Sequence, residues 1–148
     1  MKRLSLLASA ALALAACATS VPMGTASDDA AGKTFSPPSA GRAALYVYQA
    51  QSNVVLDITA NQRLLGTLGE FSYLRTEVPP GRYELRARVN NVDAALLPLD
   101  VRAGEIRYVR ATAAPQTYTL REEPASVAQP AILTAKRISE IKFLEVPY

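Results

Sequence analysis

The stretch Arg82–Val89, RYELRARV, decides the fold of this chain, and it directly follows the turn Pro79-Pro80-Gly81. The residues that alternate along it are Tyr83, Leu85, Ala87 and Val89 on one side and Arg82, Glu84, Arg86 and Arg88 on the other. Successive side chains of a β-strand point to opposite faces, so one face is apolar and the other charged. The pattern predicts a strand of a sheet with one face on a core and one in water.

Similar short runs lie on both sides of this strand and are separated by turn signals. The expected strands are residues 43–48, 54–59, 63–68, 71–78, 82–89, 95–101, 105–112 and 116–121. Turns are expected at Asn61-Gln62, Asn90-Asn91 and Ala103-Gly104. This spacing favours an all-β fold, a small antiparallel sandwich-like domain over residues 41–148.

The end of the chain has a different pattern. Residues 122–139 have weak helical character, and Ile132, Leu133 and the pair Lys136-Arg137 are expected in one short helix near the C-terminus. Ile141, Phe143 and Leu144 are expected to form a last strand or an extended segment packed on the sheet.

The first 16 residues predict a cleaved signal peptide. Lys2 and Arg3 precede an apolar run from Leu4 that ends at Leu14-Ala15-Ala16-Cys17. The run is shorter than the roughly 20 residues of a membrane-spanning helix. Its end resembles the lipobox of bacterial lipoproteins, and this resemblance implies a diacylglycerol on the Cys17 sulfur and an acylated amino terminus.

This resemblance predicts where in the cell the protein is located. Two or more acyl chains give stable membrane attachment, so the membrane is the first expected partner, held through Cys17. Ala18 stands where an aspartate often retains lipoproteins at the inner membrane, which favours the periplasmic face of an outer membrane in the bacterial envelope. Residues 17–40 are rich in Ala, Ser, Thr, Gly, Pro and Asp, and we expect them to form a flexible tether.

Composition argues against catalysis and nucleic-acid binding. The formal charge is +3 over 148 residues, and loss of Lys2 and Arg3 with the signal peptide lowers it to +1, so the pI of 9.2 does not indicate a nucleic-acid partner. The chain has no histidine and one cysteine, which excludes histidine-dependent triads and histidine-ligated metal sites. We therefore predict a non-enzymatic protein without cofactor or metal.

The first candidates for a binding surface are Arg82, Arg86 and Arg88. They share one face of the expected strand 82–89 with Glu84. Arginine makes planar, bidentate contacts to carboxylates and phosphates. The simpler interpretation is the solvated face of an antiparallel sheet.

Tyr46 and Tyr48 are the second candidates, and they lie opposite Leu45 and Val47. If their face is exposed, the rings can stack on a sugar or a partner protein. If a helix covers it, they belong to the core, and this interpretation is favoured because the C-terminal segment needs a surface to pack against.

From about Pro38 to Val146 the chain resembles the small bacterial lipoprotein domains of the DUF2846 family. The segments that carry the resemblance are Ala44–Tyr48, Asn61–Gly66, Ser72-Tyr73, Val78–Leu85 and Gly104 with Tyr108-Val109. The resemblance implies a sandwich-like β domain on a lipid anchor and no activity. Gln51-Ser52-Asn53 is brief, so any binding loop there is small.

Two hypotheses of function follow. The first is a membrane-anchored envelope lipoprotein that acts as a protein-binding or assembly accessory, with an envelope protein or the cell wall as its partner. The second is a small-ligand or glycan-binding module, including peptidoglycan, that uses Tyr46, Tyr48, Arg82, Arg86 and Arg88.

Overall fold

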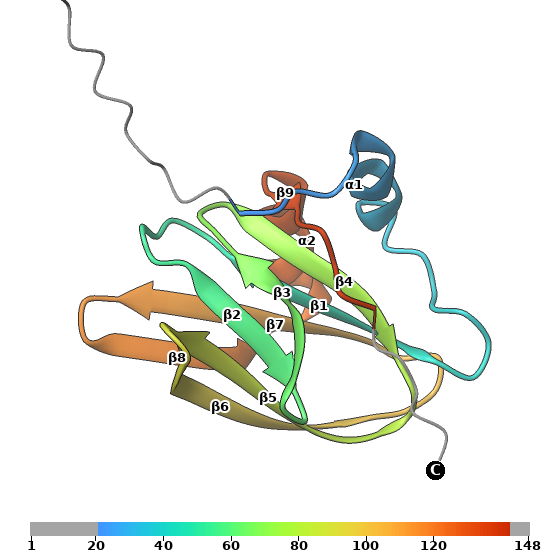
Figure 1. Cartoon of the computed structure of the whole chain (residues 1–148). Helices are drawn as coiled ribbons and strands as arrows, with labels where there is room; N and C mark the ends of the chain where they lie inside the picture. The colour runs from blue at the N-terminus through green and yellow to red at the C-terminus, as the bar shows by residue number, and fades with distance from the viewer. Residues whose placement is uncertain (1–20, 143–148) are drawn as a thin grey trace, which may run out of the picture.

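The computed structural model describes residues 21–142 and shows two β-sheets with two short helices (Figure 1). The elements in chain order are α1 (Ala26–Gly32), β1 (Ala43–Gln49), β2 (Leu56–Ala60), β3 (Arg63–Leu68), β4 (Ser72–Val78), β5 (Gly81–Val89), β6 (Val92–Val101), β7 (Ile106–Ala114), β8 (Thr117–Glu122), α2 (Ala125–Leu133) and β9 (Lys136–Arg137). The predicted all-β sandwich with a short helix near the C-terminus is confirmed.

The two sheets differ in the direction of their strands. One sheet has the order β3-β2-β5-β6, and all its neighbours are antiparallel. The other has the order β8-β7-β1-β4-β9, in which β1 pairs parallel with β7 and β4 pairs parallel with β9. The second sheet is therefore mixed, since its other pairs, β1 with β4 and β7 with β8, are antiparallel. Parallel neighbours need a longer crossover connection than a hairpin.

Asparagine and glutamine form the tight turns of the antiparallel sheet. Asn61 and Gln62 connect β2 to β3 with φ values of 46° and 68°, and Asn90 and Asn91 connect β5 to β6 with 50° and 64°. Two consecutive residues with positive φ are the geometry of the two-residue hairpin turn whose twist matches that of the strands, and asparagine tolerates it well. These turns fix the register on which the alternation of β5 depends.

The main core lies between the sheets and is formed by the inward residues of both. It contains Leu45 and Val47 of β1, and Leu85 and Ala87 of β5. The opposite residues of β5, from Arg82 to Arg88, lie on the outer face as the alternation requires.

A second core lies on the other side of β1, beneath the helices. All seven residues of β1 are buried, so this strand has no face toward solvent. Tyr46 and Tyr48 pack there with Tyr73 of β4, and Ile132 of α2 covers them. The Tyr46 hydroxyl donates to the Gly32 carbonyl oxygen at 2.8 Å. The core interpretation of Tyr46 and Tyr48 is therefore correct, and their assignment as exposed binding residues is wrong, because α2 and the segment after α1 cover them.

The prediction of a flexible tether is wrong for residues 21–40. Thr25 and Asp28 form a capping box at the start of α1, with the Thr25 Oγ1 accepting from the Asp28 amide at 3.0 Å. Gly32 is buried against Tyr73, and the Tyr73 hydroxyl donates to the Asp29 carbonyl oxygen at 3.0 Å. These contacts offset the ordering entropy that the polar composition alone cannot.

The two ends of the described chain hold each other. The Gly24 amide donates to the Arg137 carbonyl oxygen, and the Ser139 amide donates to the Pro22 carbonyl oxygen. The Asp29 carboxylate accepts from the Arg137 amide at 2.9 Å, and the Arg137 guanidinium donates to the Asp28 carbonyl oxygen at 2.8 Å. We call this set of contacts the terminal clasp.

The C-terminal prediction is partly wrong. Ile132 and Leu133 lie in α2 as expected, but Lys136 and Arg137 form β9, which adds to the edge of β4. Ile141 extends along β3, where its amide donates to the Leu65 carbonyl oxygen at 2.7 Å. Phe143 and Leu144 lie outside the described residues.

Truncating Tyr46 is expected to be strongly destabilising. Its side chain is fully buried, and Tyr46→Ala removes a large ring together with the hydrogen bond to Gly32. We expect a loss of about 3–5 kcal/mol in the free energy of unfolding, measured by urea denaturation of the mature chain. Leu96→Ala, at a half-exposed position of β6, is the control and is expected to change it by less than about 1 kcal/mol. A small effect of Tyr46→Ala would contradict the burial of this ring in the core.

The terminal clasp is expected to weaken in acid. Burial acts to raise the pKa of Asp29, but hydrogen bonds from Lys33 and the Arg137 amide outweigh it, so the pKa lies below the ordinary 3.8. A lowered folded-state pKa stabilises the protein above pH 3.8, and this contribution disappears as the pH falls below that value. The stability difference between the native chain and Asp29→Asn should therefore shrink from pH 6 to pH 3. A constant difference would show that the charge of Asp29 has no such role.

Candidate functional site

The buried tyrosines form a rigid aromatic cluster rather than a binding surface. The Tyr46 ring centroid lies 5.2 Å from that of Tyr108 and 5.6 Å from that of Phe35. The Arg75 Nε donates to the Tyr46 hydroxyl at 3.2 Å, and its guanidinium lies 5.8 Å from the ring centroid. Burial raises the pKa of the phenols of Tyr46, Tyr48 and Tyr73. These groups stay neutral and hold the helices to the sheet.

The three arginines share the outer face of β5, where carboxylates accompany them. Arg86 donates to Asp93 at 2.6 Å and to Glu84 at 2.8 Å. Arg88 donates to the Asn91 carbonyl oxygen at 2.6 Å, and its Nε lies 3.2 Å from an Asp93 oxygen without hydrogen-bond geometry. Arg82 is exposed on the same face, opposite Asp100 of β6. A free anion would have to compete with these neighbours, so the face suits a protein partner of mixed charge better than a lone phosphate.

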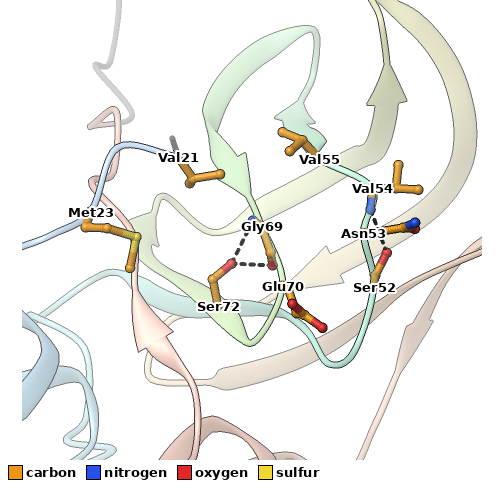
Figure 2. Close-up of a pocket in the computed structure, with 9 residues that line it drawn as sticks. All are labelled: Val21, Met23, Ser52, Asn53, Val54, Val55, Gly69, Glu70 and Ser72. Atoms are coloured by element: carbon orange, nitrogen blue, oxygen red, sulfur yellow. Dashed lines mark hydrogen bonds between the residues drawn. The ribbon is translucent and has the colours of Figure 1, made fainter. Parts of the chain in front are cut away.

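A pocket of about 410 Å³ lies at one end of the sandwich (Figure 2). Three separate segments line it. They are the N-terminal Val21 and Met23, the β1–β2 connection with Ser52, Asn53, Val54 and Val55, and the β3–β4 turn with Gly69, Glu70 and Ser72. The lining is largely apolar, and Glu70 is its one charged side chain among the described residues.

Two serines shape the pocket from within. The Ser72 Oγ donates to the Gly69 carbonyl oxygen at 2.8 Å and accepts from its amide at 2.9 Å, which closes the β3–β4 turn. The Ser52 Oγ accepts from the Val54 amide at 3.0 Å, and the Gln49 side-chain amide donates to the Val54 carbonyl oxygen at 2.7 Å. Because both hydroxyls bind their own loops, the exposed polar groups of the lining are Asn53 and Glu70.

The N-terminal residues that line this pocket, Val21 and Met23, belong to the segment that the sequence predicts as a tether. Val21 packs on Gly69, where an added Cβ would lie 2.9 Å from the Val21 Cγ2. A glycine at this position therefore lets the N-terminal segment cross the β3–β4 turn. The brief loop Gln51–Asn53 was the only sequence signal of the site, because the other walls come from residues far apart in the chain.

The remaining predictions concern the lipidated cysteine, metal ligands and membrane-spanning helices. Cys17 lies outside the described residues, and the described chain begins four residues later at Val21. Within residues 21–142 no three His, Cys, Asp or Glu side chains group as metal ligands. The same part of the chain contains no helix long and apolar enough to cross a membrane.

Comparison with known proteins assigns no family. No family model matches the chain, and no curated protein matches it. Among solved structures, the N-terminal domain of AlgF from P. aeruginosa is similar to part of the chain, with 24% identity and a TM-score of 0.37 over 59% of this chain and 99% of that domain. This degree of likeness does not define a function, and the resemblance to the DUF2846 family stays a prediction.

Proposed function

We propose that the protein is a non-enzymatic lipoprotein of the bacterial envelope, anchored at Cys17, whose β-sandwich is a protein-binding or assembly accessory. The observation that carries the proposal is the place of Val21 in the fold. Val21 already packs on Gly69, four residues after Cys17. A lipid at Cys17 would therefore lie only four residues from the sandwich. A short connection of this kind suits a domain that works at the membrane surface.

The number of residues between Cys17 and Val21 limits how far the sandwich can lie from the lipid. Four residues span at most about 14 Å when fully extended. A tether through residue 40 would have allowed a reach of a few nanometres. With the short connection, the domain meets partners that lie at the same membrane or within the sandwich's own length of it.

The carboxyl groups with a shifted pKa are poor candidates for an acid catalyst. An acid catalyst at neutral pH needs a carboxyl whose pKa is raised. Among the described residues, the carboxyls with a shifted pKa are Asp28, Asp29, Glu77 and Glu105, and each shift is downward. Hydrogen bonds from Thr25 lower the pKa of Asp28, and the backbone of Arg102 lowers that of Glu105. Such carboxylates stay charged and structural.

A small-ligand module is the second candidate, and the pocket favours it. Its volume of about 410 Å³ falls within the range of small-molecule sites. The lining suits a neutral ligand with an apolar part and a hydrogen-bonding group near Asn53. This candidate predicts that amide signals of Val54, Val55 and Gly69 shift on titration with neutral oligosaccharides of N-acetylglucosamine in a nuclear magnetic resonance experiment. Shifts spread over the whole sandwich, or none, would remove it.

Cys17→Ser tests the anchor. We expect the native chain in the membrane fraction with the mass of an acylated Cys17, and the variant as an uncleaved precursor that carries no lipid. Ala18→Ser keeps the cysteine and is the control, with processing expected to be unchanged. Membrane attachment and mature mass that do not change in Cys17→Ser would contradict the proposal.

A photo-crosslinking residue at Arg82 tests the binding role. Arg82 lies exposed on the outer face of β5, and a crosslinker at Ala31 of α1, which is exposed on the helix side, is the matched control. In intact cells we expect Arg82 to capture a reproducible envelope protein or cell-wall fragment and Ala31 to capture less. Capture of neither, together with no retention on purified cell wall, would count against an accessory role.

A further inference from the structure

We infer that the end of the sandwich that carries the pocket is a membrane-contact surface, seated on the lipid bilayer through exposed apolar side chains. We call it the anchor end and define it by residues 21–23, the connections 50–55 and 69–71, and the turn 90–91. The inference rests on the proposed lipid anchor, because it states which surface that anchor brings to the membrane.

The first support is the arrangement of the chain. Residues 50–55, 69–71 and 90–91 all lie at one end, since Gln49 pairs with Ser72 and Asp57 pairs with Arg88. The N-terminal segment enters the fold at this same end, beside the β3–β4 turn (Figure 1). The ten residues of β6 span about 33 Å. A connection of about 14 Å therefore holds the anchor end, and not the opposite one, at the lipid.

The second support is the chemistry of this end. Two large apolar side chains are exposed there: Met23 is 47% exposed and Phe71 is 48% exposed. They come from two different segments, and the half-buried Val54 and Val55 line the pocket that Met23 also lines and that lies beside Phe71. Exposed apolar side chains also occur elsewhere, such as Leu96 and Leu133, but here they flank a largely apolar pocket, and this combination is what an interaction surface presents.

The third support is the conformation of Phe71. Its φ is 46°, a left-handed conformation that is rare for an aromatic residue. Two backbone hydrogen bonds hold it, from the Phe71 amide to the Ala50 carbonyl oxygen and from the Lys136 amide to the Phe71 carbonyl oxygen. These bonds fix the direction in which the turn presents the exposed ring. Aromatic rings are the side chains that settle at the membrane–water interface.

The occupant that fits is a lipid surface. The anchor end presents several separate apolar contacts around one open pocket, and its pocket holds a single charge, that of Glu70. A lipid already attached nearby makes even a weak contact effective, because binding is then intramolecular. The side chains need to enter only the boundary between headgroups and acyl chains, about 5–10 Å deep.

Tryptophan fluorescence tests the inference directly, because the native chain has no tryptophan. The full mature lipoprotein carrying Phe71→Trp is reconstituted in vesicles of phosphatidylethanolamine and phosphatidylglycerol with brominated acyl chains. We expect strong quenching and a blue shift relative to vesicles without bromine. Met23→Trp is a second reporter at the same end and guards against misfolding of the first. Leu64→Trp, on β3 just after the Asn61–Gln62 turn at the opposite end, is the matched control and should keep its fluorescence.

The outcomes separate this inference from the proposed function. If lipidated protein binds the vesicles but Phe71→Trp and Met23→Trp are not quenched, the membrane-contact surface is wrong and the anchor stands. Equal quenching of Leu64→Trp also overturns it, because the domain then has no fixed orientation. Capture of one envelope protein by a photo-crosslinking residue at Phe71 in native envelopes, without quenching of Phe71→Trp by brominated lipid in vesicles, would assign the anchor end to a protein and overturn the lipid surface. Failure of the anchor itself appears separately, as an unlipidated Cys17.

Discussion

The burial of β1 on both faces is the constraint on which the rest of the structure depends. Leu45 and Val47 fill the space between the sheets, whereas Tyr46 and Tyr48 face the other way. A strand of this kind needs a layer on each side, because an apolar face exposed to water would lose the stabilisation that burial gives. The antiparallel sheet β3-β2-β5-β6 provides one layer, and α2 with the segment after α1 provides the other. The helices are therefore part of the fold and not appendages to it.

The terminal clasp completes this arrangement by sealing the edge of the sandwich. Ile138 crosses β3 at Gly66, where an added Cβ would lie 2.7 Å from the Ile138 Cδ1. A side chain at this position would force Ile138 to shift, so the glycine lets the C-terminal segment pack closely on β3. Residues 21–24 then pair with this segment through Met23 and Ile138. Because an open edge is a template for unwanted pairing, the two chain ends protect β3 and β4, and Val21 and Met23 of the N-terminal end also line the pocket.

The strands could be predicted from the sequence because their signals are local. Alternation in β5 and the Asn-Asn turn that follows it act within a few residues, and no distant partner can change the period. The helix α1 could not be predicted in the same way. Its composition is that of a disordered segment, and it is ordered through Arg137, 108 residues after Asp29. The pocket was missed for the same reason, since its walls come from three distant segments.

The tyrosines show a finer limit. Alternation correctly separated Tyr46 from Leu45, but it says nothing about what lies above either face. That depended on α2, whose docking is set by burial of Ile132 rather than by any local pattern near β1. A residue's face can therefore be read from its own strand, whereas its exposure needs the position of every other layer. The five candidate binding residues divide along this line: the helices cover the tyrosines of β1, whereas the arginines of β5 lie on the outer face, where Arg82 is exposed and Arg86 and Arg88 are half-buried.

The order of residues 21–40 changes how the proposed anchor acts. A slack tether would let the sandwich rotate freely, and every face would meet the surroundings equally. A connection of at most about 14 Å removes most of that freedom. With the anchor that we propose, Arg88 of β5 would lie nearer to the membrane and Arg82 farther from it. Such an anchor would select which surface of the sandwich a partner in the envelope can reach.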